Sequence, residues 1–149
     1  MDAILHLFCE SIQKLCVADY DAEQIRVWVA GAQKEAVWQE RIQKDHFLLA
    51  EREETLLGFG SLSEAGYLDL LYVGHHFVRQ GIAHSLFEAL ATEAIRQGQS
   101  MLRADVSITA RPFFEKMGFE VLHPNVFQLE GVEIMNFRME KSLPPSLAC

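Results

Sequence analysis

Hydrophobic positions recur every three or four residues in the first third of the chain, a period that is typical of amphipathic helices. The pattern predicts three helices, over residues 2–17, 21–32 and 35–44. Asp21 precedes Glu23 and Gln24, so we expect its carboxylate to cap the second helix by accepting hydrogen bonds from free amides. No strand pattern precedes His46, and the chain therefore opens with a helical region.

From His46 onward the hydrophobic period changes to two, which predicts strands. Three short runs suit an antiparallel meander with polar turns between them, over residues 46–53, 55–62 and 67–74. A helical face then returns after Gly81 and ends at Gly98, where a C-terminal glycine is expected.

The rest of the chain alternates between the two periods. It predicts a strand over 101–107, a helix over 109–117 with Pro112 in its first turn, and strands over 119–123 and 132–141. The residues between the last two strands are interpreted as a loop. The order of elements predicts an α/β (α+β) domain with a mixed sheet flanked by helices.

The composition indicates one globular domain. The chain has 149 residues, of which 50% are hydrophobic and 23% are charged, enough to bury a single core. We expect four parts within this domain: a helical region, strands with the long helix, a second α/β part and a loose tail, over residues 1–45, 46–98, 99–143 and 144–149.

Charge and cysteine content exclude several classes of partner. The formal charge of −8 provides no basic footprint for nucleic acid or for an anionic membrane. No run approaches the roughly 20 apolar residues of a membrane span, and no basic segment opens a signal peptide. Cys9, Cys16 and Cys149 lack paired spacing, which predicts neither a disulfide framework nor a zinc site and fits a cytoplasmic protein.

The junction "YVGHHFVRQGIA" joins a strand to the long helix through Gly81. The first amides of a helix lack internal partners and lie at the positive end of its dipole, so such a junction binds anions, phosphate above all. Taken alone, the segment favours a plain helix start over an anion site, because one glycine is weak evidence. Neither a P-loop nor a G-x-G-x-x-G dinucleotide fingerprint is present.

The order of elements over 46–143 and two local motifs resemble the GNAT superfamily of N-acetyltransferases. The first motif is Val73 followed by "VRQGIA", similar to the family's Q/R-x-x-G-x-G/A loop, whose amides hold the pyrophosphate of acetyl-CoA. The second is "ADVSITARPFFEKMGFEV", similar to a strand ending in Ser or Asn followed by A-x-x-F-[YF]-E-K-x-G-F. The resemblance implies a central, mostly antiparallel sheet with splayed strands, and acetyl-CoA as cosubstrate without a metal.

The resemblance also implies the site residues. Acetyl-CoA would be bound by Leu71, Tyr72, Val73, Val78, Arg79, Gln80, Gly81, Ile82, Ala83, His84, Ser107, Ala110, Phe113 and Phe114. A strand bulge would free an amide near Leu71, Tyr72 or Val73 toward the thioester oxygen. Asp69 is the first candidate for the base that deprotonates the acceptor amine, and Asp105 is the second. Each could equally be a surface aspartate.

The chain departs from the family pattern at four places. Val78 replaces Gln or Arg, Arg79 stands where a second glycine is frequent, and Phe114 replaces a tyrosine that protonates the leaving thiolate in many members. The usual first strand is missing, so the sheet edge is either exposed or covered by a partner chain. The second alternative would make the protein a homodimer.

Three functions follow from these features. The first is N-acetyl transfer from acetyl-CoA to a primary amine of a small molecule or a peptide. The second is a non-catalytic module that binds or senses CoA, and the third is an interaction domain without a cofactor. We interpret His75, His76 and His84 as loop histidines without a metal, because no carboxylate partner is evident. Trp28 and Trp38 would either wall the acceptor cleft or pack in the core.

Overall fold

The computed structural model describes residues 1–145, and it opens with a helical region as predicted. Its elements are α1 (Asp2–Leu15), α2 (Ala22–Val29), the short 3-10 helix η1 (Ala30–Gln33) and α3 (Glu35–Lys44). The expected cap is present, since Gln24 N donates to Asp21 Oδ1 at 2.8 Å and Asp21 N donates to Gln24 Oε1 at 2.9 Å. The expected tail lies mostly outside the described residues.

The first sheet is the predicted antiparallel meander. It contains β1 (His46–Arg52), β2 (Thr55–Leu62) and β3 (Leu68–Val73), in that order across the sheet. The register between β2 and β3 pairs Ser61 with Leu70 but Leu62 with Leu68, which leaves Asp69 as the extra residue of a β-bulge.

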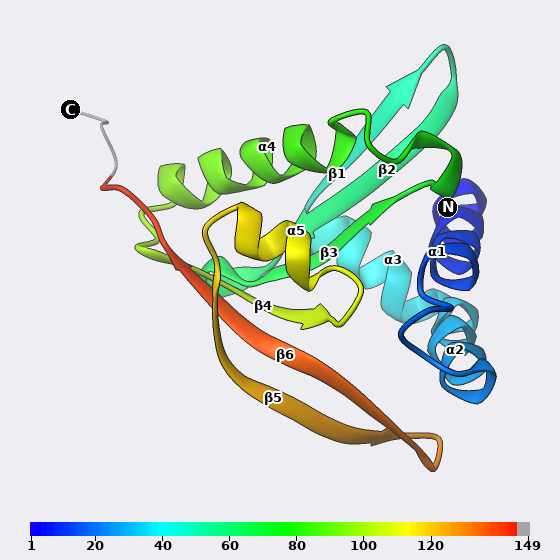
Figure 1. Cartoon of the computed structure of the whole chain (residues 1–149). Helices are drawn as coiled ribbons and strands as arrows, with labels where there is room; N and C mark the ends of the chain where they lie inside the picture. Colours follow the sequence, from blue (N-terminus) through cyan, green and yellow to red (C-terminus); the bar gives the residue numbers. More distant parts are fainter. Residues whose placement is uncertain (146–149) are drawn as a thin grey trace.

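The long helix α4 (Ile82–Arg96) follows β3 through the 3-10 helix η3 (His75–Phe77) and packs against the first sheet (Figure 1). Gly60 allows this close approach, because a Cβ there would lie 2.9 Å from Leu90 Cδ1 on α4. The helix ends before Gly98, which adopts a left-handed φ of 81° as a C-terminal glycine does.

The second sheet contains β4 (Met101–Ser107), β5 (Glu120–Leu129) and β6 (Val132–Ser142), in the antiparallel order β4-β6-β5. Helix α5 (Arg111–Lys116) connects β4 to β5. The loop interpretation of residues 123–131 is wrong for most of its length. β5 continues to Leu129, and Glu130 and Gly131 alone form the turn, with left-handed φ values of 49° and 80°. β5 is an edge strand, which tolerates Pro124.

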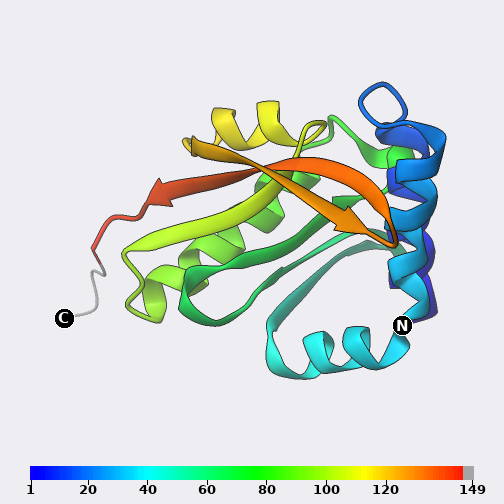
Figure 2. The same ribbon diagram turned by 90° about the horizontal axis from the view of Figure 1, so that it is seen from below.

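The two sheets are joined at one end and diverge from there. A single parallel bridge pairs Tyr67, just before β3, with Arg103 of β4. Beyond this bridge the β5-β6 hairpin diverges from the first sheet. Helices α1 and α2 lie side by side at one end of the molecule (Figure 2). The mixed α/β architecture with splayed, antiparallel sheets and no strand among the described residues before His46 agrees with the sequence-based expectation.

The core forms on both faces of the first sheet. One cluster joins α1, α2 and Trp38 to one face, and a second joins α4, α5 and β4 to the opposite face. A smaller third cluster packs Ile82 and Leu86 of α4 against Leu57 of β2. Phe59, with no exposed surface, belongs to the first cluster, and Leu90 and Leu102 belong to the second. Within residues 1–145, no helix has the length and apolarity needed to cross a membrane.

Candidate active site

A cleft of ≈ 1440 Å³ runs between the diverging strands β3 and β4. One end lies at the start of α4, and the other is enclosed by α1, α2 and the β5-β6 hairpin. Every predicted site residue lines this cleft except Gln80: Leu71, Tyr72, Val73, Val78, Arg79, Gly81, Ile82, Ala83, His84, Ser107, Ala110, Phe113, Phe114, Asp69 and Asp105. The cleft thus brings together residues from both sequence motifs.

The α4 end of the cleft has the features of an anion site. Gly81 adopts a φ of 81° as the residue before the helix, and among the described residues no side chain caps this end. The first helical hydrogen bond across the junction runs from Ser85 N to Gly81 O, so the amides of Ile82 to His84 precede it. A Cβ on Gly81 would meet no atom within 4 Å, and the approach to these amides is therefore open.

Arg79 also adopts a left-handed conformation, with a φ of 63°. Residues other than glycine populate this region at a cost of about 1 kcal/mol or more. This backbone requirement gives a physical reason why a glycine suits the position. Arg79 keeps the shape of the loop at the expense of local strain, and it adds a positive charge to an otherwise acidic protein.

The middle of the cleft is formed by the ends of the two diverging strands. The bulge of β3 lies at Asp69, whereas the pairing of Leu70 to Val73 with β2 is continuous, so the irregularity falls earlier than the predicted site near Leu71. On the facing strand, Ser107 Oγ accepts a hydrogen bond from Ala110 N at 3.0 Å and holds the turn into α5. The side chain of Phe114 is only 5% exposed and packs edge-on against Phe119.

Asp69 has the environment of a carboxylate that can accept a proton. Its side chain is mostly buried, and Arg41 Nε lies 3.2 Å from its Oδ2. Burial raises the pKa of Asp69, Arg41 lowers it, and the nearby charge of Asp105 raises it; the net shift is upward. The Arg41 partner was missed because α3 lies far from β3 in the sequence.

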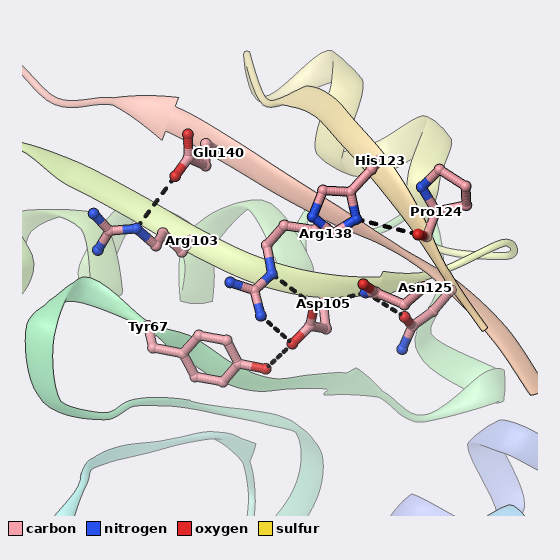
Figure 3. Close-up of polar contacts among 9 residues, drawn as sticks. Tyr67, Arg103, Asp105, His123, Pro124, Asn125, Arg138 and Glu140 are labelled. Atoms are coloured by element: carbon pink, nitrogen blue, oxygen red, sulfur yellow. Dashed lines mark hydrogen bonds and ion pairs between the residues drawn. The ribbon is translucent and has the colours of Figure 1, made fainter. Parts of the chain in front are cut away.

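Asp105 is held in a network of hydrogen bonds on β4 (Figure 3). Arg138 Nε donates to Oδ1 at 2.8 Å, Asn125 Nδ2 donates to the same oxygen at 2.9 Å, and the Tyr67 hydroxyl donates to Oδ2 at 2.6 Å. Burial raises the pKa of Asp105, but the hydrogen bonds from Arg138, Tyr67 and Asn125 outweigh it, and the net shift is downward. This carboxylate is therefore organised as a charged acceptor.

The N-terminal helical region contributes side chains to the cleft that sequence reasoning mostly missed. Tyr20 and Trp28 both line the cleft, and their rings meet edge-on at 5.3 Å. Trp38 instead lies in the core at 2% exposure, with its Nε1 donating to Gly31 O at 3.1 Å. Of the two tryptophans, only Trp28 is at the cleft.

The expectation that these histidines lack a carboxylate partner is wrong for all three. Glu10 of α1 lies beside His75 and His76, with its Oε1 2.9 Å from His75 Nδ1. His84 instead pairs with Glu88 one helical turn further along α4, at 3.4 Å. No sequence signal linked Glu10 to a loop more than sixty residues away.

Comparison with known proteins places these features in a family. A model of the acetyltransferase (GNAT) domain matches residues 16–141. The uncharacterised N-acetyltransferase YafP of Escherichia coli K12 is 31% identical over 133 residues, which cover 89% of this chain and 83% of that protein.

Solved structures agree with this assignment. A GCN5-related N-acetyltransferase from Rhodopseudomonas palustris superposes with a TM-score of 0.91 at 32% identity, over 95% of this chain and 90% of that one. The PaiA N-acetyltransferase from Thermoplasma acidophilum, solved in complex with coenzyme A, has the same fold with a TM-score of 0.75 at 24% identity, over 95% of this chain and 91% of that one.

Proposed function

Since this chain belongs to the GNAT family of acetyltransferases, we propose that it transfers an acetyl group from acetyl-CoA to a primary amine of a small molecule or a peptide. The observation that carries the proposal is one continuous cleft, which joins the anion-binding end of α4 to Asp69 and to the aromatic side chains of the N-terminal helices. The relative solved with coenzyme A supports the choice of cosubstrate.

The pyrophosphate of acetyl-CoA binds at the start of α4. Backbone amides of residues 81–84 donate to its oxygens, and the helix dipole favours its negative charge. Arg79 adds a side-chain cation at the same end. Because most contacts come from the backbone, Val78 does not prevent binding even though it has no polar group.

The pantetheine arm and the thioester lie between β3 and β4. Among the described residues the Tyr67–Arg103 bridge, just before β3, is the one pairing that joins them, so the backbone groups of β3 and β4 that do not pair with β2 or β6 are available to an extended ligand. An amide among Leu71, Tyr72 and Val73 donates to the thioester oxygen and stabilises the oxyanion that forms on attack. Phe113 and Ala110 form the opposite wall of the cleft.

Asp69 serves as the general base. An alkylamine has a pKa of about 10.4, so near neutral pH only about one molecule in a thousand is neutral. The amine nitrogen attacks the thioester carbon, its proton passes to Asp69 directly or through water, and the C–S bond breaks to release CoA thiolate. Phe114 has no proton to donate, so water protonates the thiolate. A raised pKa suits Asp69 to this role better than the lowered pKa of Asp105.

The acceptor end of the cleft combines apolar walls with acidic groups. Trp28, Leu129 and Ile134 provide apolar surface, while Asp69 and Asp105 provide negative charge. A cationic amine carried on an apolar group fits this combination. The overall charge of −8 favours the approach of such a cation.

The test offers the protein acetyl-CoA and a panel of primary amines. Acetylation is detected by the CoA thiol that is released and by the mass of the product. Asp69→Asn is expected to lower kcat/KM by about 10²–10⁴-fold near neutral pH, with the deficit shrinking as the pH approaches that of amine deprotonation. The affinity for acetyl-CoA, measured by calorimetry, should not change. Equal turnover of the variant and the wild type at every pH would remove Asp69 from the mechanism.

Asp45→Asn is the matched control. Asp45 also faces Arg41 and has a pKa raised by burial, but it is not among the described residues that line the cleft. Its turnover should equal that of the wild type. Acetyl-CoA binding without acetylation of any amine would favour the non-catalytic CoA-binding module, and no binding of either acetyl-CoA or dephospho-CoA would refute both functions.

A further inference from the structure

The side chains of Glu10, His75 and His76 converge outside the cleft. Glu10 lies on α1, and the two histidines lie on η3, the segment that follows β3 and runs beside α1 (Figure 1). One ligand atom from each residue lies within 4.8 Å of those from the other two. The described residues that line the cleft include none of these three.

The spacing of these atoms suits a small cation. Around a tetrahedral Zn²⁺ with bonds of about 2.0–2.1 Å, neighbouring ligand atoms are about 3.3 Å apart. Glu10 Oε1 lies 2.9 Å from His75 Nδ1 and 4.0 Å from His76 Nε2, so the two distances bracket this value. Rotation of the more exposed His76 ring would shorten the longer distance, and the shorter one would lengthen by a few tenths of an ångström on binding an ion.

The second oxygen of Glu10 is held by a fourth residue. His6, one helical turn earlier on α1, places Nε2 2.7 Å from Glu10 Oε2. Carboxylates that bind metals are commonly oriented in this way by an outer hydrogen bond. Glu10 is thereby fixed with Oε1 directed toward the two histidines.

One side of the cluster, at His76, is exposed to solvent. The side chains of His75 and Glu10 are 19% and 31% exposed, whereas that of His76 is 72% exposed. The two imidazole rings lie with their centroids 3.8 Å apart beside one carboxylate oxygen. Two imidazolium ions so close would repel each other, while two neutral imidazoles with a carboxylate form a three-ligand set with room for water at the fourth position.

We propose that Glu10, His75 and His76 form a binding site for a divalent transition metal ion, with Zn²⁺ as the best match for this nitrogen and oxygen donor set. The ion would connect α1 to the segment that leads into the start of α4. Ser11 and Phe77, the neighbours of Glu10 and His76, line the cleft, so the ion would fix the position of one cleft wall.

The experiment titrates Zn²⁺ into the metal-depleted full chain by calorimetry. The expected result is one ion per chain, an affinity at least about tenfold weaker for Glu10→Gln and for His75→Gln, and a rise in Tm with Zn²⁺ that these variants lack. Glu88→Gln is the matched control, because Glu88 pairs with His84 across one turn of α4 but belongs to no cluster of three metal-ligating side chains among residues 1–145. Its Zn²⁺ binding should equal that of the wild type.

Two results would overturn the proposal. The absence of stoichiometric Zn²⁺ binding to the wild type would leave the cluster as an ordinary set of ion pairs. Unchanged Zn²⁺ affinity in both Glu10→Gln and His75→Gln would place the bound ion elsewhere. Substitutions on two different elements separate loss of a ligand from local misfolding, since both should leave the circular dichroism spectrum unaltered.

Discussion

The hydroxyl of Tyr20 joins three parts of the molecule around the acceptor end of the cleft. It accepts a hydrogen bond from Ile108 N at 3.0 Å, beyond the end of β4, and donates to Met135 O of β6 at 2.7 Å. Tyr20 itself follows α1 and is only 5% exposed. Burial raises the pKa of Tyr20, so the hydroxyl keeps its proton and remains a donor.

Tyr20→Phe removes both bonds while preserving the ring. It leaves one amide and one carbonyl unpaired in a partly buried region, and each such group costs about 1–1.5 kcal/mol, near the lower end of the range for buried groups. The free energy of unfolding should therefore fall by about 2–3 kcal/mol. For a chain of this size that corresponds to a fall in Tm of about 4–12 °C.

The assay is urea unfolding followed by circular dichroism, with the wild type and the variant sharing one m-value. Tyr67→Phe is the control, because the hydroxyl of Tyr67 donates to Asp105, whose carboxylate keeps Arg138 and Asn125 as partners. It should cost about 1 kcal/mol or less. A loss below about 0.5 kcal/mol for Tyr20→Phe would show that water replaces both bonds and that Tyr20 does not fix the helices to the second sheet.

Two further predictions concern the departures from the family pattern. Phe114→Tyr should leave kcat within about twofold of the wild type, because water protonates a thiolate readily; a large gain in turnover, measured by thiol release, would show that the native site lacks a needed acid. Arg79→Gly should relieve left-handed strain of about 1 kcal/mol and raise or maintain Tm, while weakening acetyl-CoA binding and its dependence on salt in calorimetry. Stronger binding by the glycine variant would mean that loop shape outweighs the charge of Arg79.

Most of the fold follows from local signals in the sequence. The cap at Asp21, the start of the long helix after Gly81 and its stop at Gly98 each depend on residues within one turn of the chain. Such signals can be recognised in the sequence, because the backbone amides and carbonyls that they satisfy lie within the same few residues. Apart from the longer β5, the helices and strands accordingly lie close to their predicted positions.

The errors arise where distant residues or the position of a strand in its sheet decide the outcome. Residues 123–131 were interpreted as a loop, yet most of them form an edge strand that accepts Pro124, and edge position is a property of the sheet rather than of the segment. The bulge at Asp69 depends on its register with β2. Arg41 beside Asp69 and Glu10 beside His75 come from helices that only the tertiary fold brings near.

The departures in the sequence act on different steps of the proposed reaction. All three residues line the cleft. In the proposed complex, Val78 and Arg79 would lie at the pyrophosphate end, where backbone amides would carry most of the binding, and Phe114 would lie near the leaving thiolate. None of them is among the groups that shift the pKa of Asp69, which depends on burial, on Arg41 and on Asp105. Loss of cofactor affinity and loss of turnover are therefore separable in this chain, and a defect confined to turnover would point to the leaving group or to the acceptor rather than to the loop.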